Sequence, residues 1–305
     1  MKAGSNKLLK DIRKNMGLYI LLAIPVIWYI VFKYIPMYGL QIAFRRFNPT
    51  LGIMKSPWVG FTYFEQFFNS YYFRDVLFNT VSLSVFTLFV GFPAPIFLAL
   101  VINEIKNTRL KKAVQNITYM PNFLSVVVIV SMLALFSNKE YGLFNQITGF
   151  FGIGPVDYMS KPTAFQPLYV FSNVWQYMGF NAIIYIAALT SVDPQLYEAA
   201  SIDGASRFQK IIHISIPAIM GTILILLIMR IGSIMDVGFE KVLIMQRDVT
   251  LSVSEVISTF IYKNGIQKGQ FSYSTAVGIF NSVINFLLLV GANMISKKTA
   301  KTGLW

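Results

Sequence analysis

Long runs of apolar residues, separated by short polar or charged segments, dominate the chain. Six of these runs are long enough to cross ~30 Å of hydrocarbon as helices of ~20 residues. They cover about 18–40, 76–103, 113–137, 167–191, 217–236 and 273–296. The pattern predicts an all-α membrane protein with six transmembrane helices. Prolines inside several runs, such as Pro93 and Pro121, predict kinks in those helices.

The basic residues between these runs are distributed unevenly. With the N-terminus in the cytoplasm, the cytoplasmic segments hold 14 Lys and Arg, and the longer external segments hold 10. Clusters at 106–112 and 297–301 supply half of the cytoplasmic residues, whereas Arg45 and Arg46 lie against the trend. Because cytoplasmic loops of membrane proteins are enriched in Lys and Arg, we expect both termini to lie in the cytoplasm.

Composition restricts the chemistry further. The 305 residues are 55% hydrophobic and only 13% charged, with no Cys and one His. This excludes a disulfide framework, a thiolate metal site and a Cys nucleophile, and we expect neither a metal nor a catalytic centre. The net charge is +13, but the basic residues do not form a patch with aromatic residues, so we expect contact with membrane lipid and not with nucleic acid.

The organisation along the chain is simple. No cleavage site of small residues accompanies the first apolar run, so residues 18–40 are expected to remain as an N-terminal anchor helix. Neither a linker rich in Pro or Ser nor an internal repeat divides the rest. We therefore expect one transmembrane domain over residues 1–305, with its core at about 76–296.

The segment 193–217, between the fourth and fifth runs, carries the most informative local pattern. Asp193 is a good helix N-cap and Pro194 fits the first helical turn, so a short helix should follow. Gly204 can adopt the left-handed conformation that ends a helix, and a second helix should lead to Pro217. Local chemistry leaves two interpretations open: docking into a groove of another protein, or an amphipathic loop at the membrane surface.

The same segment resembles the cytoplasmic loop of ABC importer permeases, whose pattern is E-A-A, three residues, G, nine residues, I-x-L-P. The matching residues are Glu198, Ala199, Ala200, Gly204, Ile214 and Pro217, while Ile216 replaces the leucine. In that family the loop forms a coupling helix that enters a cleft of the ATPase subunit. The resemblance implies this role for Glu198, Ala199, Ala200, Ser201, Asp203, Gly204 and Pro217.

Further stretches resemble permeases for oligosaccharides and polysaccharides, including the larger maltose permease subunit. They lie at 36–41 with 47–49, at 141–145 with Gly152 and 160–162, and at 173–175. The resemblance implies a subunit of a bacterial cell membrane importer that forms half of an alternating-access pathway for an oligosaccharide or polysaccharide fragment. An ABC permease for a polyamine or phosphate is the alternative. A secondary transporter would leave the loop match unexplained, and a membrane enzyme would need a catalytic cluster that the spans do not offer.

The energy for such transport must come from another chain. The sequence contains no G-x-x-x-x-G-K-[ST] phosphate-binding loop, so this subunit is not expected to be an enzyme or to hold a cofactor. The resemblance implies a second permease subunit in a heterodimer and an ABC ATPase dimer that binds the ATP. It also implies an extracytoplasmic solute-binding protein that delivers the oligosaccharide.

Polar residues inside the predicted spans are candidates for contact with the substrate. They are Asn173, Gln176, Tyr177 and Phe180 in the fourth span, and Arg230 and Ser233 in the fifth. Aromatic and amide groups bind sugars, and an ionisable group within a span usually faces a cavity. The alternatives are helix packing by the amides and a structural ion pair between Arg230 and Asp236 or an acid of a partner.

Overall fold

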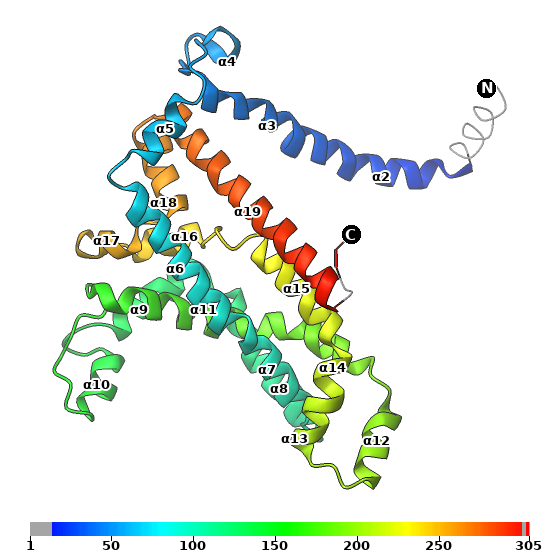
Figure 1. Cartoon of the computed structure of the whole chain (residues 1–305). Helices are drawn as coiled ribbons and strands as arrows, with labels where there is room; N and C mark the ends of the chain where they lie inside the picture. Colours follow the sequence, from blue (N-terminus) through cyan, green and yellow to red (C-terminus); the bar gives the residue numbers. More distant parts are fainter. Residues whose placement is uncertain (1–13, 301–302, 305) are drawn as a thin grey trace.

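The computed structural model describes residues 14–300 and 303–304, and its regular structure there is helical (Figure 1). The single β contact in these ranges is an antiparallel bridge between Arg45 and Trp58. The prediction of an all-α chain is confirmed for these residues. Most of the basic N-terminal segment, and Lys301, which entered the argument about orientation, lie outside the described residues.

The N-terminal anchor helix stands away from the other helices (Figure 1). It runs without interruption over Met16–Phe44 and comprises α2 (Met16–Tyr29), a π-helical turn (Ile30–Tyr34), α3 (Ile35–Met37) and a 3-10 turn (Tyr38–Phe44). No residue of its apolar stretch is buried. Its C-terminal end contacts the rest of the molecule, where Ser272 donates a 2.7 Å hydrogen bond to the carbonyl of Arg45. Apolar side chains exposed on every face of this helix require lipid or a partner chain around them.

Two further helices are long and apolar enough to cross a membrane. One combines α6 (Phe73–Gly91) and α7 (Pro93–Asn103), and the other is α19 (Phe271–Ala300). Phe92 interrupts the regular helix within this span, and α7 restarts with Pro93 in its first turn, where a missing N–H costs little. These elements lie where the second and sixth spans were predicted.

The third predicted span is not one continuous helix. It divides into α8 (Thr108–Tyr119) with a 3-10 turn (Met120–Phe123), and α9 (Val126–Phe136), which meet at 98°. Leu124 and Ser125 adopt extended conformations between them, and the Ser125 hydroxyl caps α9 by accepting from the Val128 N–H. The kink predicted from Pro121 is a full break just after this residue, because the chain ends one helix and caps a new one in the middle of the run.

The fifth predicted span is also bent and ends earlier than expected. It consists of α13 (Arg207–Lys210), a π-helical turn (Ile211–Ser215), α14 (Ile216–Ala218) and α15 (Met220–Ile231), with a bend of 62° before α15. The chain then turns, and Asn285 of α19 fixes this turn by accepting a 3.0 Å hydrogen bond from the N–H of Met235. The predicted end at residue 236 is thus five residues too late. Counting each bent pair as one span gives five apolar spans in the described residues.

The fourth predicted span is α11 (Pro162–Thr190), which packs centrally against α6, α7 and α8. Its 29 residues give a length of about 44 Å at 1.5 Å per residue, which exceeds the hydrocarbon thickness. Polar residues lower its hydropathy, so it is not one of the five apolar spans. At Gly179 an added Cβ would lie 2.0 Å from the carbonyl oxygen of Thr118, so only glycine permits this close approach to α8.

Short helices complete the structure. They are α4 (Gly52–Lys55), α5 (Thr62–Phe68), α10 (Leu143–Gly149), α12 (Pro194–Ile202), α16 (Phe239–Met245), α17 (Leu251–Ser254) and α18 (Ile257–Tyr262). α12 lies at the opposite end of the molecule from α4 and α5 (Figure 1). Three buried apolar clusters hold the bundle together. They join α9, α11 and α16; α7, α11 and the bend before α15; and α5, α6, α18 and α19.

Candidate coupling helix and translocation cavity

The short helix α12 has the start and end that its sequence predicts. The Asp193 carboxylate accepts a 2.9 Å hydrogen bond from the N–H of Gln195, and Pro194 occupies the first turn. Gly204 has φ 77°, and the N–H of Ala205 reaches back to the carbonyl of Ala200 at 2.9 Å. This is the 6→1 bond of a left-handed helix ending, which glycine adopts without steric strain.

α12 lies on the surface of the molecule, and hydrogen bonds connect one of its sides to the residues that follow it. None of its residues is buried, and Ile202 is 87% exposed. Ser201 accepts a 2.6 Å hydrogen bond from the Lys210 ammonium of α13, and the Tyr197 hydroxyl lies 3.0 Å from that of Ser215. These contacts fix the helix to the foot of the fifth span while its outer face stays uncovered.

The other residues of the motif have defined places. Glu198 and Ala199 lie on the exposed part of α12, and Ala200 is half-buried. Asp203 follows the last residue of the helix. Pro217 lies in the first turn of α14, where the fifth span begins. The motif therefore connects an exposed short helix to the fifth predicted span, and hydrogen bonds fix the position of one relative to the other.

A second feature is a cavity of about 620 Å³ between α11, α15, α16 and the α6–α7 helix. Asn173, Tyr177 and Arg230 line it, so the structure brings three of the predicted substrate-contact residues together. The remaining charged residues of the lining are Asp236, Glu240 and Lys241. A cavity of this size with mixed aromatic, amide and charged walls can accommodate a hydroxyl-rich ligand.

The other three predicted contact residues do not line this cavity. Gln176 is 1% exposed and donates a 3.1 Å hydrogen bond to the carbonyl of Leu124. Phe180 packs edge-on against Phe123. The Ser233 hydroxyl donates to the carbonyls of Met229 and Arg230 in its own turn, both at 3.4 Å. In this conformation Gln176 and Phe180 support the break between α8 and α9, and the role in substrate binding stays a prediction for all three.

Arg230 has a different setting from the one that its position in the sequence suggested. It lies in the last turn of α15, where a cation is favoured by the helix dipole, and it is exposed. No ion pair joins it to Asp236 in the described structure. Asp236 instead accepts a 3.0 Å hydrogen bond from Asn281 of α19. The guanidinium is thus available to a ligand in the cavity.

Lys241 is a site residue that the sequence did not reveal. It lies on α16, outside the predicted spans, and is 2% exposed. Its ammonium donates a 2.9 Å hydrogen bond to Asn173 and lies 5.7 Å from the centre of the Tyr169 ring. Within the part of the chain that the structure describes, no carboxylate forms an ion pair with it. Burial lowers the pKa of Lys241 to about 7. Its charged form would be stabilised by an anion in the cavity.

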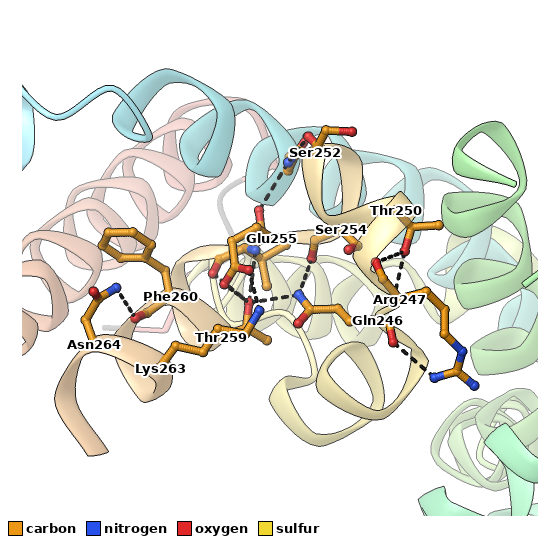
Figure 2. A network of polar contacts seen from close by, with 12 residues as sticks. Gln246, Arg247, Thr250, Ser252, Ser254, Glu255, Thr259, Phe260, Lys263 and Asn264 are labelled. Atoms are coloured by element: carbon orange, nitrogen blue, oxygen red, sulfur yellow. Dashed lines mark hydrogen bonds and ion pairs between the residues drawn. The ribbon is translucent and has the colours of Figure 1, made fainter. Parts of the chain in front are cut away.

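A polar network positions the helix that carries Lys241 (Figure 2). Gln246, at the end of α16, donates to the carbonyl of Ser254 at 2.9 Å and to the hydroxyl of Thr259 at 3.3 Å. Thr259 donates to Glu255 at 3.0 Å, and Glu255 pairs with Lys263 at 2.5 Å. A helix of seven residues is unstable alone, so these bonds to α17 and α18 set its place at the cavity wall.

Comparison with protein families matches residues 91–301 to the binding-protein-dependent transport system inner membrane component family. The chain belongs to this family. It is therefore a membrane component of a transport system that depends on a binding protein. The matched region extends from the end of α6 to the end of α19, so it contains α12 and most of the cavity wall, and it leaves the anchor helix outside.

Similar proteins agree with this assignment over nearly the whole permease. Protein LplB of Bacillus subtilis (strain 168) is 40% identical over 294 residues, covering 96% of this chain and 92% of that protein. The polygalacturonan/rhamnogalacturonan transport system permease protein YteP of the same organism is 39% identical, covering 100% and 95%. A chain of the solved bacterial alginate ABC transporter, in complex with alginate pentasaccharide-bound periplasmic protein, has a TM-score of 0.89 at 39% identity, covering 98% and 100%.

Proposed function

We propose that this permease is one of two membrane subunits of an ATP-driven importer for carboxylate-bearing oligosaccharides. The observation that carries the proposal is the cavity in which Arg230 and the buried Lys241 lie beside Asn173 and Tyr177. Neither cation forms an ion pair in the described residues. Arg and Lys bind carboxylates through charge-assisted hydrogen bonds, and amide and aromatic groups suit the sugar ring.

Two similarities support an acidic substrate. The relative YteP is described as a polygalacturonan/rhamnogalacturonan permease, and the solved transporter imports the acidic polysaccharide alginate. The cavity wall also contains Asp236 and Glu240, so it is not uniformly positive. Asp236 accepts a hydrogen bond from Asn281. We propose that both carboxylates accept hydrogen bonds from hydroxyl groups of the sugar.

The transmembrane topology follows from the same proposal. Six spans are formed by Met16–Phe44, α6–α7, the bent pair α8–α9, α11, the bent pair α14–α15, and α19. Both termini lie in the cytoplasm, so α12 faces the cytoplasm and α4, α5 and α10 face outward. α11 counts as a span because its polar groups face the cavity and neighbouring helices, although its hydropathy is lower.

In this proposal α12 transmits the movement of the ATPase to the membrane spans. We assign it as the coupling helix, which inserts its exposed face with Leu196 and Ile202 into a cleft of an ATPase subunit. ATP binds to the ATPase dimer, and this chain needs no cofactor of its own. A second, different permease subunit forms the other half of the pathway, and the binding protein delivers the sugar from outside. Closure of the ATPase dimer moves the coupling helices and reorients the spans.

Uptake into proteoliposomes tests this function. The complete importer, its binding protein and internal ATP are supplied with an oligogalacturonate, or with the same oligosaccharide after chemical reduction of its carboxyl groups. We expect ATP-dependent uptake of the acidic form and much slower uptake of the reduced form. Equal uptake of both would contradict the acidic substrate, and absence of ATP-dependent uptake of either would contradict the importer for this class of sugar.

A further inference from the structure

A second cavity, separate from the translocation cavity, lies between α9, α10 and the first half of α11. It has a volume of about 720 Å³, within the range of about 300–1,000 Å³ typical of ligand pockets. Its walls are formed by apolar side chains that include Met132, Phe136, Leu168 and Phe171. A sugar cannot satisfy its hydroxyl groups against such walls, so the ligand must be largely apolar.

The charge that the lining of this cavity carries is positive. Lys161 is the single charged residue of the lining, and its side chain is exposed. It is also the N-cap residue of α11, whose start has no side-chain cap, so the positive end of the helix dipole points to the same place. Hydroxyl groups of Thr148 and Tyr158 lie in the lining and bond to each other at 3.0 Å. An apolar body with an anionic head is the matching ligand.

The height of the cavity along α11 fits the boundary of the membrane. Lys161 precedes the fourth predicted span, which starts at residue 167, by six residues, or about 9 Å at 1.5 Å per residue. This is the level of lipid head groups, where Lys side chains are favoured. The apolar wall continues from that level into the hydrocarbon layer.

We propose that this cavity is a binding site for a glycerophospholipid with an anionic head group. One acyl chain enters between α9 and α11, and the phosphate lies at Lys161 and the start of α11. Occupation would link α10 to α9 and to α11, and α11 also lines the translocation cavity. The site does not depend on the substrate, because its walls share no residue with the translocation cavity.

Photochemical labelling of the complete complex in lipid nanodiscs tests the site. The probe is phosphatidylglycerol with a diazirine at the end of one acyl chain, in a background of phosphatidylcholine, and labelled residues are located by mass spectrometry. We expect label on Met132, Phe136 or Leu168 above the level on Phe286 and Leu287, which are exposed on α19. Labelling no stronger than on α19 would overturn the proposal.

Two variants separate a specific site from general lipid contact. Ala164→Phe fills the cavity from its wall, so label there should fall to the level of α19. Lys161→Glu should weaken capture of the anionic probe about fivefold, whereas Lys139→Glu, at an exposed lysine outside the lining, should not. Unchanged labelling in Ala164→Phe, or cross-links from the cavity to a partner polypeptide in place of lipid, would overturn the site.

Discussion

The side-chain amide of Gln176 donates a 3.1 Å hydrogen bond to the carbonyl of Leu124, at the point where α8 and α9 separate. That carbonyl belongs to a residue in an extended conformation, so no helical N–H is available to it. Gln176 thus stabilises the break between α8 and α9, because an unpaired carbonyl is costly in an apolar environment.

Removing this amide should destabilise the permease. Gln176→Leu leaves the Leu124 carbonyl without its partner, which costs about 1–3 kcal/mol for a buried group. We expect a lower midpoint of thermal unfolding for the purified complex, measured by size-exclusion chromatography after heating. Ser282→Ala is the control, because among the described residues that hydroxyl bonds only to a carbonyl of its own helix. An unchanged midpoint in Gln176→Leu would show that water or another group satisfies the carbonyl.

Gly204 should be essential for coupling because of its backbone conformation. Its φ of 77° costs a β-branched residue about 1–2 kcal/mol or more, so Gly204→Val should displace the end of α12. We expect ATP hydrolysis that no longer drives uptake, measured in proteoliposomes. Gly221→Val is the matched control, since both positions have open space for a side chain and Gly221 lacks the positive φ. Gly204→Asn should retain part of the coupling, because Asn tolerates the left-handed region.

The two cations of the translocation cavity should determine selectivity and not assembly. Arg230 forms no ion pair in the described residues, so Arg230→Gln should give a normal yield of the complex. Loss of a charge-assisted hydrogen bond should raise the half-saturating concentration of an acidic oligosaccharide about 10- to 100-fold for Arg230→Gln and for Lys241→Gln. Failure of Arg230→Gln to assemble, with recovery after neutralisation of a facing acid, would identify a structural ion pair instead.

The ion pair of Figure 2 should act through the position of α16. Glu255→Gln and Lys263→Met each break the pair. The loss of stability in the double variant should be smaller than the sum of the losses in the two single variants, and the difference, which is the coupling energy, should be about 0.5–3 kcal/mol. Because Glu255 also accepts from Thr259, Glu255→Gln should reduce affinity for the acidic sugar more than Lys263→Met does. Strictly additive effects on the unfolding midpoint would indicate that the pair contributes nothing.

The proposed orientation can be measured directly because the chain contains no Cys. Single Lys139→Cys and Lys301→Cys variants are exposed to a membrane-impermeant maleimide in intact cells. We expect labelling at position 139 and none at 301 until the membrane is opened. Equal labelling of both from outside would contradict the topology.

The sequence by itself determined the features that depend on neighbouring residues. Asp193, Pro194 and Gly204 specify the beginning and end of α12 through caps and a left-handed residue, and the structure reproduces both. The long apolar runs likewise placed α6–α7 and α19, because hydropathy over 20 residues is a local property.

Only the tertiary structure decided which polar groups meet. Asn173 and Gln176 lie three residues apart on one helix. Asn173 faces the cavity, whereas Gln176 donates a hydrogen bond to the Leu124 carbonyl at the break between α8 and α9. Lys241 reaches Asn173 from 68 residues away, on a helix that hydropathy placed outside the spans. Such contacts depend on where the chain breaks, as at Leu124 and after Ile231. The local sequence contributes Pro121 and the Ser125 cap to the first break, and hydrogen bonds between helices fix the geometry of both.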